Sequence, residues 1–173
     1  VVEAKIGDAN TANPMHAAFE QLLRYRNGRK ETIQAGLKEG EPHLFDTNLL
    51  LYLLSTDAAK ADRAEALLAA GGVLSVQVLN EFAAVASRKL DLAWPELREV
   101  LGTVQSVCQV EPMTVATHER GLAIAERYGF SIYDSLIVAA ALLAGCELVW
   151  TEDLQDGQRI EDQLTVKNPF PAS

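Results

Sequence analysis

Cysteine and histidine are scarce in this chain of 173 residues. It has two cysteines, Cys108 and Cys146, and three histidines, His16, His43 and His118. Each cysteine lies in an apolar segment, and neither has a second cysteine or a histidine at the spacing of a zinc site. We therefore predict that both cysteines are small core residues rather than parts of a disulfide or a zinc site.

Long apolar runs are also lacking. The longest, residues 136–144, is well short of the roughly 20 residues that a membrane-spanning helix needs. The N-terminal residues do not show the basic-then-apolar pattern of a signal peptide. A hydrophobic content of 49% is too high for a disordered chain. We expect a soluble, cytoplasmic protein with one globular domain, an appendage and no membrane association.

Basic residues are too few for a broad nucleic-acid-binding face. The formal net charge is −9, and residues 1–42 carry six acidic and six basic side chains, so the whole imbalance lies in residues 43–173. Domains that bind nucleic acid usually show a basic face. The charge therefore argues against broad nucleic-acid binding, unless several acids share one site that binds cations.

The chain divides into an N-terminal extension, residues 1–42, and an α/β domain, residues 43–173. Helical spacing of apolar residues predicts one amphipathic helix over residues 15–26 of the extension. In the domain, short apolar runs alternate with helical patterns, which predicts a three-layer α/β/α fold with a mainly parallel central sheet. The predicted strands are residues 44–45, 73–76, 107–110, 147–151 and 164–166. A first helix is predicted to begin near residue 49, and five more are predicted at residues 57–70, 76–90, 94–106, 115–128 and 131–144.

Three acidic residues lie where such a sheet binds ligands, outside the carboxyl ends of its strands. Asp46 and Asp153 each follow a predicted strand, and Asp134 opens a helix near the same edge. Each also has a purely structural interpretation. Asp46 suits a helix N-cap and Asp134 suits a capping box begun by Ser131. Asp153 fits an ordinary solvated turn, and a cap and a site role are compatible.

Glu81 lies on the predicted helix after the second strand and has no basic residue one turn away. Its helical neighbours are Gln77, Val78, Ala84 and Val85. A carboxylate on such a face is protonated, exposed at an edge, or matched to a cation. An exposed edge position without function and a place in a cation site both remain open.

Carboxylates that converge at one sheet edge repel one another and destabilise the fold unless a cation joins them. Mg²⁺ and Mn²⁺ suit oxygen ligands, and Mg²⁺ usually keeps several waters. A metal-bound water can lose a proton and attack phosphorus, while the metal stabilises charge on the leaving oxygen. The acids therefore indicate metal-dependent hydrolysis of a phosphodiester.

Four motifs in order resemble the PIN-domain ribonucleases, and most closely the VapC-type toxins of bacterial toxin–antitoxin pairs. They are FDTN at 45–48, the glutamate of SVQVLNEF at 75–82, IYDSLIVAAA at 132–141 and TEDLQDG at 151–157. The resemblance covers about residues 43–170. It implies that the family's catalytic, metal-binding acids correspond to Asp46, Glu81, Asp134 and Asp153.

The same resemblance implies a Mg²⁺- or Mn²⁺-dependent endoribonuclease. Asn48 is placed to hold a ligand or water, and Thr151 matches the family's small hydroxyl residue before the last acid. Asp156 competes with Asp153 for the fourth position. The implied substrate is RNA, usually a structured RNA such as tRNA, cut to leave a 3′-hydroxyl and a 5′-phosphate. The implied partners are a second copy of the chain, in a homodimer, and a cognate antitoxin.

The extension departs from the family pattern, in which the first strand begins within a few residues of the start. Residues 1–42 could be inert, add a dimer surface, or contact RNA phosphates through Arg29 and Lys30. They could also inhibit in cis, with a helix in an apolar groove and an arginine against the acids.

A rival function is a catalytically idle PIN-like module that binds RNA or a protein, which the sequence alone does not exclude. A phosphatase of the haloacid-dehalogenase type needs a second acid two residues after the first, where this chain has Asn48. A dinucleotide-binding domain needs a glycine-rich loop after the first strand, and none follows Phe45.

Overall fold

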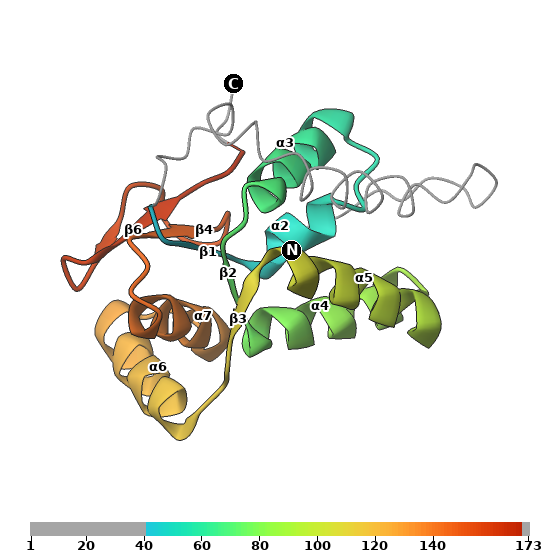
Figure 1. Cartoon of the computed structure of the whole chain (residues 1–173). Coiled ribbons are helices and arrows are strands. Elements are labelled where there is room, and N and C mark those ends of the chain that lie inside the picture. Colours follow the sequence, from blue (N-terminus) through green and yellow to red (C-terminus); the bar gives the residue numbers. More distant parts are fainter. Residues whose placement is uncertain (1–40, 171–173) are drawn as a thin grey trace.

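The computed structural model describes residues 41–170, which form a six-stranded sheet with helices on both faces (Figure 1). The strand order is β3-β2-β1-β4-β6-β5, and all neighbours are parallel except β5 and β6. The predicted α/β fold with a mainly parallel sheet is therefore confirmed. The predicted helix at residues 15–26 lies outside the described residues.

The strands are short, and a pair of helices follows each of the first three. The strands are β1 (His43–Phe45), β2 (Val73–Ser75), β3 (Gln109–Glu111), β4 (Leu148–Trp150), β5 (Arg159–Ile160) and β6 (Leu164–Lys167). The helices are α2 (Thr47–Tyr52), α3 (Ala58–Ala69), α4 (Val76–Lys89), α5 (Trp94–Val107), α6 (Val115–Tyr128) and α7 (Ile132–Leu143).

The core lies on both faces of the sheet, because parallel strands are covered on both sides. Leu44, Val149 and Val166, from three neighbouring strands, are at most 1% exposed. Residues 135–141 of α7 are all buried, which accounts for the longest apolar run in the chain. No helix within residues 41–170 is long and apolar enough to cross a membrane. Both cysteines are free and buried, as predicted.

Two elements differ from the prediction. Strand β3 begins at Gln109 because α5 continues to Val107, and β5 was not predicted. Strand β5 is two residues long and joins β6 through a turn in which Glu161 and Asp162 have φ angles of 50° and 56°. Such hairpin turns usually carry Asn-Gly or Asp-Gly, so this turn had no recognisable sequence signal.

The sheet brings the carboxyl ends of β1 and β4 side by side. Their register pairs Phe45 with Trp150, and the Asp46 amide donates to the carbonyl of Trp150 at 3.0 Å. The residues that follow the two strands, Asp46 and Thr151, therefore meet at one edge although they are far apart in the chain.

Candidate metal site

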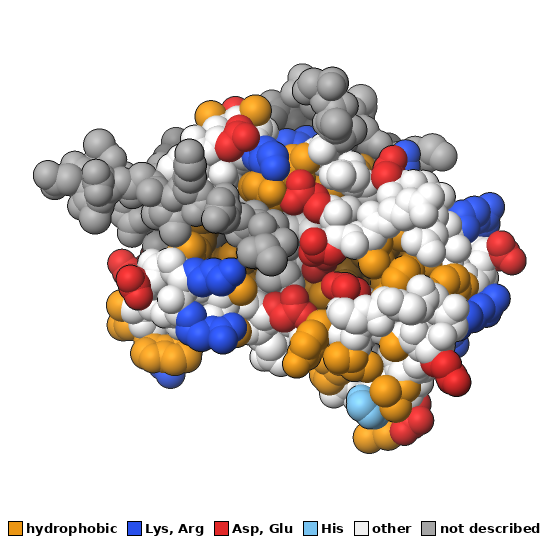
Figure 2. Space-filling view, turned by 180° about the vertical axis from the view of Figure 1, so that it is seen from behind, with side chains coloured by type: hydrophobic (Ala, Val, Ile, Leu, Met, Phe, Trp, Pro, Cys, Tyr) orange, Lys and Arg blue, Asp and Glu red, His pale blue; other side chains and the backbone are white. Residues whose placement is uncertain are grey.

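Three carboxylates from separate segments gather at this edge of the sheet. Asp46 follows β1, Asp134 lies in the first turn of α7, and Asp153 follows β4. One oxygen of each lies within 4.8 Å of the others. Figure 2 shows a group of acidic side chains near the middle of one face of the molecule. The predicted convergence of acids is thus observed for these three.

Asp46 is the buried member of this acid cluster, with 4% of its surface exposed. It is the N-cap of α2, as predicted, and its Oδ1 accepts from the Thr47 amide at 2.5 Å. Its Oδ2 accepts from the Thr151 hydroxyl at 2.5 Å. The pKa of Asp46 is raised to about 7, mainly by burial and also by the charges of Asp153 and Glu81, while the two hydrogen bonds oppose the rise.

Asn48 and Thr151 connect the first acid to the third. Asn48 Nδ2 lies 3.5 Å from Asp46 Oδ2 and 3.4 Å from Asp153 Oδ2, which are long hydrogen bonds. The Thr151 hydroxyl that donates to Asp46 also accepts from the Asp153 amide at 3.1 Å. In the described part of the chain, Asn48 Oδ1 is buried and has no hydrogen-bond partner. An orphaned acceptor on a residue that contacts two of the clustered carboxylates suits a hydrated cation, whose waters donate hydrogen bonds.

Asp134 is held by the N-terminus of its own helix. Ser131 is the N-cap of α7, as predicted, and its hydroxyl accepts from the Asp134 amide at 3.1 Å and donates to Asp134 Oδ2 at 2.7 Å. Partial burial raises the pKa of Asp134 and the Asp153 charge adds to this, whereas the Ser131 bond lowers it. The cap therefore orients the carboxylate toward the cluster, and the two roles are compatible.

Glu81 lies beside the acid cluster but is not one of its three members. Its Oε1 accepts from Gln77 Nε2 at 2.7 Å, and its Oε2 accepts from the Thr47 hydroxyl at 3.1 Å. Its charge still contributes to the raised pKa of Asp46. Asp156, the competitor of Asp153, also lies outside the cluster, and its Oδ1 accepts from the Asn168 amide at 2.8 Å.

Two polar residues that support the site were not singled out from the sequence. Thr47 connects the Asp46 segment to Glu81, and its position inside the FDTN motif was the available signal. Gln77 precedes Glu81 by one helical turn, and such a pair is a known stabilising contact on helices. Both place the Glu81 carboxylate beside the Asp46 segment.

The donor set fits a hard divalent cation. Carboxylate oxygens are the ligands that Mg²⁺ and Mn²⁺ prefer, and a bound cation would offset both the burial that chiefly raises the pKa values of Asp46 and Asp134 and the repulsion that adds to it. The three-residue cluster found among residues 41–170 contains no histidine or cysteine. It therefore lacks the nitrogen and sulfur ligands that are typical of zinc sites.

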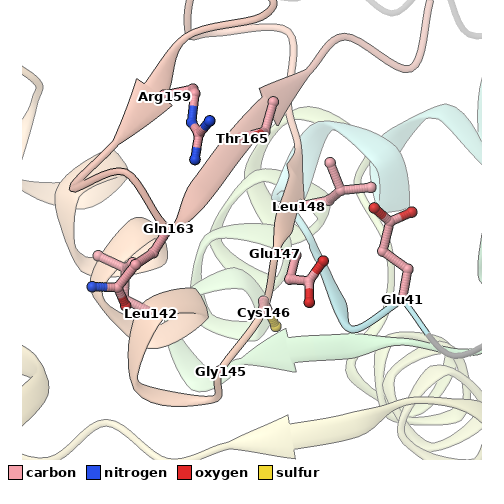
Figure 3. A pocket seen from close by; sticks show the side chains of 9 residues that line it. All are labelled: Glu41, Leu142, Gly145, Cys146, Glu147, Leu148, Arg159, Gln163 and Thr165. Carbon is pink, nitrogen blue, oxygen red and sulfur yellow. The ribbon is translucent and has the colours of Figure 1, made fainter.

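A separate cavity of about 450 Å³ opens at the opposite edge of the sheet (Figure 3). Its lining includes Glu147 and Leu148 at the start of β4, Glu41 just before β1, and Arg159 of β5. Glu41, Glu147 and Leu148 lie at the amino ends of two central parallel strands, and the cavity lining contains none of the three clustered acids. It is therefore distinct from the candidate metal site.

Solved structures share this fold. A chain of a toxin–antitoxin complex from Klebsiella pneumoniae aligns with a TM-score of 0.58 and 22% identity, over 75% of this chain and 99% of that one. A chain of VapBC2 from Rickettsia felis, bound to a DNA fragment from their promoter, aligns with a TM-score of 0.54 and 18% identity, over 73% and 97%. At these identities the likeness concerns the fold alone. A search of curated proteins finds no match.

The sequence profile of the PIN domain matches residues 44–158, which include most of β1, all of β2 to β4 and all three clustered acids. This match confirms the family that the four motifs predicted. Because it spans more than half of the chain, the chain belongs to the PIN domain family.

Proposed function

We propose that this protein is a metal-dependent endoribonuclease of the VapC toxin type. The observation that carries the proposal is the position of three carboxylate oxygens within 4.8 Å of one another at the carboxyl edge of the sheet. Membership of the PIN domain family and the fold shared with chains of toxin–antitoxin complexes support it.

Asp46, Asp134 and Asp153 would hold Mg²⁺ or Mn²⁺. When bound, such an ion lowers the pKa of water and stabilises negative charge on a phosphodiester. The Thr47 amide and the Thr151 hydroxyl orient the Asp46 carboxylate, and Ser131 orients that of Asp134. Glu81 would complete the site from the side of α4.

Glu81 would act on the solvent around the cation rather than as a fourth close ligand. Its carboxylate lies outside the group of three whose oxygens are within 4.8 Å of one another, and Gln77 and Thr47 hold it in place by hydrogen bonds. Asn48 Oδ1 would accept a hydrogen bond from water at the same site, because its own amide group already faces Asp46 and Asp153. The chain thus supplies both charged ligands and neutral positioning groups.

RNA is the proposed substrate, and a structured RNA such as tRNA is the expected kind. Residues 43–173 carry the whole acidic excess of the chain, so RNA phosphates would be repelled without the cation. Both the binding of RNA at the site and the cleavage of RNA should therefore depend on the divalent ion.

The proposed partners are a second copy of the chain and an antitoxin. The structural neighbours are chains of toxin–antitoxin complexes. An antitoxin that places an arginine against the three carboxylates would neutralise them and exclude the metal. Light scattering on the purified chain should give the mass of a homodimer, and a monomer mass at micromolar concentration would contradict this part of the proposal.

The nuclease activity is tested with labelled tRNA and a mixed single-stranded RNA pool. We expect cleavage with Mg²⁺ or Mn²⁺, none with a chelator, and a loss of at least about 100-fold in Asp46→Asn and Asp134→Asn. Asp156→Asn is the matched control because it removes an acid of the same loop outside the cluster. Its activity should stay within about twofold of the unmodified chain.

The outcomes separate the two functions that the sequence left open. Cleavage that survives in both Asp46→Asn and Asp134→Asn would show that these residues are not the site. Metal-dependent RNA binding without any cleavage would favour the catalytically idle module instead.

The domain boundary near residue 43 is part of the proposal. A chain reduced to residues 43–173 should unfold cooperatively and bind Mn²⁺ like the full chain, because β1 begins at His43 and the PIN match begins at residue 44. If residues 1–42 inhibit in cis, the shortened chain will cleave RNA faster. Equal or lower activity would rule out self-inhibition.

A further inference from the structure

Lys60 forms an ion pair with an acid next to the candidate metal site. It lies in the first turn of α3, and its ammonium group is 3.6 Å from Glu152 Oε1. Glu152 stands between Thr151, which bonds Asp46, and Asp153, which belongs to the acid cluster. The ion pair therefore joins α3 to the segment that carries the third acid.

The ammonium group of Lys60 is itself held in place from several sides. It donates to the Tyr52 hydroxyl at 2.8 Å and lies over the rings of Tyr52 and Phe170, 4.3 Å and 5.3 Å from their centroids. Those two rings pack edge to face, with their centroids 4.4 Å apart. The hydrogen bond from Lys60 to Tyr52 is the main cause of its raised pKa, so Lys60 stays charged at neutral pH.

Asp153 needs such support because little else fixes it. It is exposed, and in the described part of the chain its carboxylate accepts one hydrogen bond, at 3.4 Å from Asn48 Nδ2. Its backbone amide donates to Thr151 Oγ1, but no regular element runs through residues 151–158. A contact at the intervening residue, Glu152, therefore restrains where Asp153 can lie.

We propose that Lys60 is a positioning residue for the metal site: it holds Glu152, and so keeps Asp153 close enough to Asp46 and Asp134 to share a cation. Lys60 also balances the negative charge that Glu152 adds beside the acid cluster. This inference rests on the proposed function, since it assumes that the cluster binds a divalent ion.

Calorimetric titration of Mn²⁺ into the full chain tests the proposal without any RNA. Lys60→Met removes the charge and keeps most of the side-chain length, and should raise the Kd for Mn²⁺ roughly three- to tenfold. Lys60→Arg keeps the charge and should stay within about twofold of the unmodified chain. Lys89→Met removes an exposed lysine at the end of α4 and should have no effect.

Two further measurements separate positioning from general stabilisation. The melting temperature in chelator should change little in Lys60→Met, whereas the rise in melting temperature on adding Mn²⁺ should shrink. Glu152→Gln should weaken Mn²⁺ binding by a similar factor, and the double variant with Lys60→Met should be no weaker than either single variant, because both changes break the same contact. Glu152→Gln also keeps the test available if Lys60→Met does not fold.

An unchanged Kd for Mn²⁺ in both Lys60→Met and Glu152→Gln would overturn this inference while leaving the nuclease proposal intact. Equal losses in Lys60→Arg and Lys60→Met would also overturn it, because the charge would then not be the cause. Absence of Mn²⁺ binding by the unmodified chain would overturn both proposals.

Discussion

The hydroxyl of Thr151 donates a 2.5 Å hydrogen bond to Asp46 Oδ2, across 105 positions of sequence. It joins the residue after β4 to the residue after β1 and supplies one of the two short hydrogen bonds to a buried carboxylate. The same hydroxyl accepts from the amide of Asp153. One small side chain thus connects two of the three clustered acids.

Thr151→Val keeps the shape of this side chain and removes its hydrogen bonds. We expect the free energy of unfolding in chelator at pH 8 to fall by about 1–3 kcal/mol, because an ionised, buried Asp46 loses a donor. Denaturant unfolding measures this change. Thr151→Ser keeps the hydroxyl and should lose much less. Equal stability of Thr151→Val and the unmodified chain would show that the bond does not support the charge.

Asp46→Asn should remove activity and stabilise the metal-free fold. The pKa of Asp46 is about 7 in the folded chain, against an ordinary 3.8. The stability this group contributes is therefore fully present below about pH 4 and is lost as the pH rises to about 7. In chelator at pH 8, Asp46→Asn should melt higher than the unmodified chain by roughly 5 °C or more.

The difference in melting temperature between Asp46→Asn and the unmodified chain should become smaller as the pH falls from 8 toward 4, because the Asp46 carboxyl of the folded chain becomes protonated. Asp156→Asn serves as the control, since that carboxylate lies outside the cluster. If Asp46→Asn melts at a lower temperature than the unmodified chain at pH 8, the claim that the buried Asp46 charge destabilises the metal-free fold is contradicted.

Metal affinity should fall as the pH drops below 7. Asp46 and Asp134 both have raised pKa values, chiefly through burial, and a carboxyl group must lose its proton to bind a cation. Between pH 7 and pH 6 the Kd for Mn²⁺ should rise by up to about tenfold, with proton release on binding. Calorimetry in buffers of different ionisation enthalpy measures both the Kd and the number of protons released on binding. An affinity independent of pH would argue against Asp46 as a ligand.

Glu81→Gln should weaken Mn²⁺ binding much less than a substitution of one of the three clustered acids. Because Glu81 lies outside the cluster, the Kd for Mn²⁺ should change by less than about threefold. Asp134→Asn should weaken binding by at least about 30-fold, since it removes a close ligand. Similar losses in the two variants would place Glu81 among the direct ligands.

The sequence predicted the parts of this molecule that depend on local pattern. Helical periodicity located α3 to α7 to within about two residues, and Ser131 was correctly predicted as a helix cap. The rule that parallel strands end at one edge placed Asp46 and Asp153 together. These predictions hold because burial and capping act over a few neighbouring residues.

Contacts between distant side chains could not be predicted in the same way. Nothing in the local pattern around Glu81 shows that Thr47 would hold it beside the cluster. The choice of Asp153 over Asp156 depends on how the chain turns after β4, and the support from Lys60 depends on the packing of α3. Each of these is decided by tertiary structure rather than by spacing.

The most direct test of the account is a crystal structure of the chain soaked in Mn²⁺, with anomalous diffraction recorded at the manganese edge. The account predicts an anomalous peak bonded to oxygens of Asp46, Asp134 and Asp153, and its disappearance in Asp134→Asn. A fully occupied crystal in which these three carboxylates bind no manganese would contradict it.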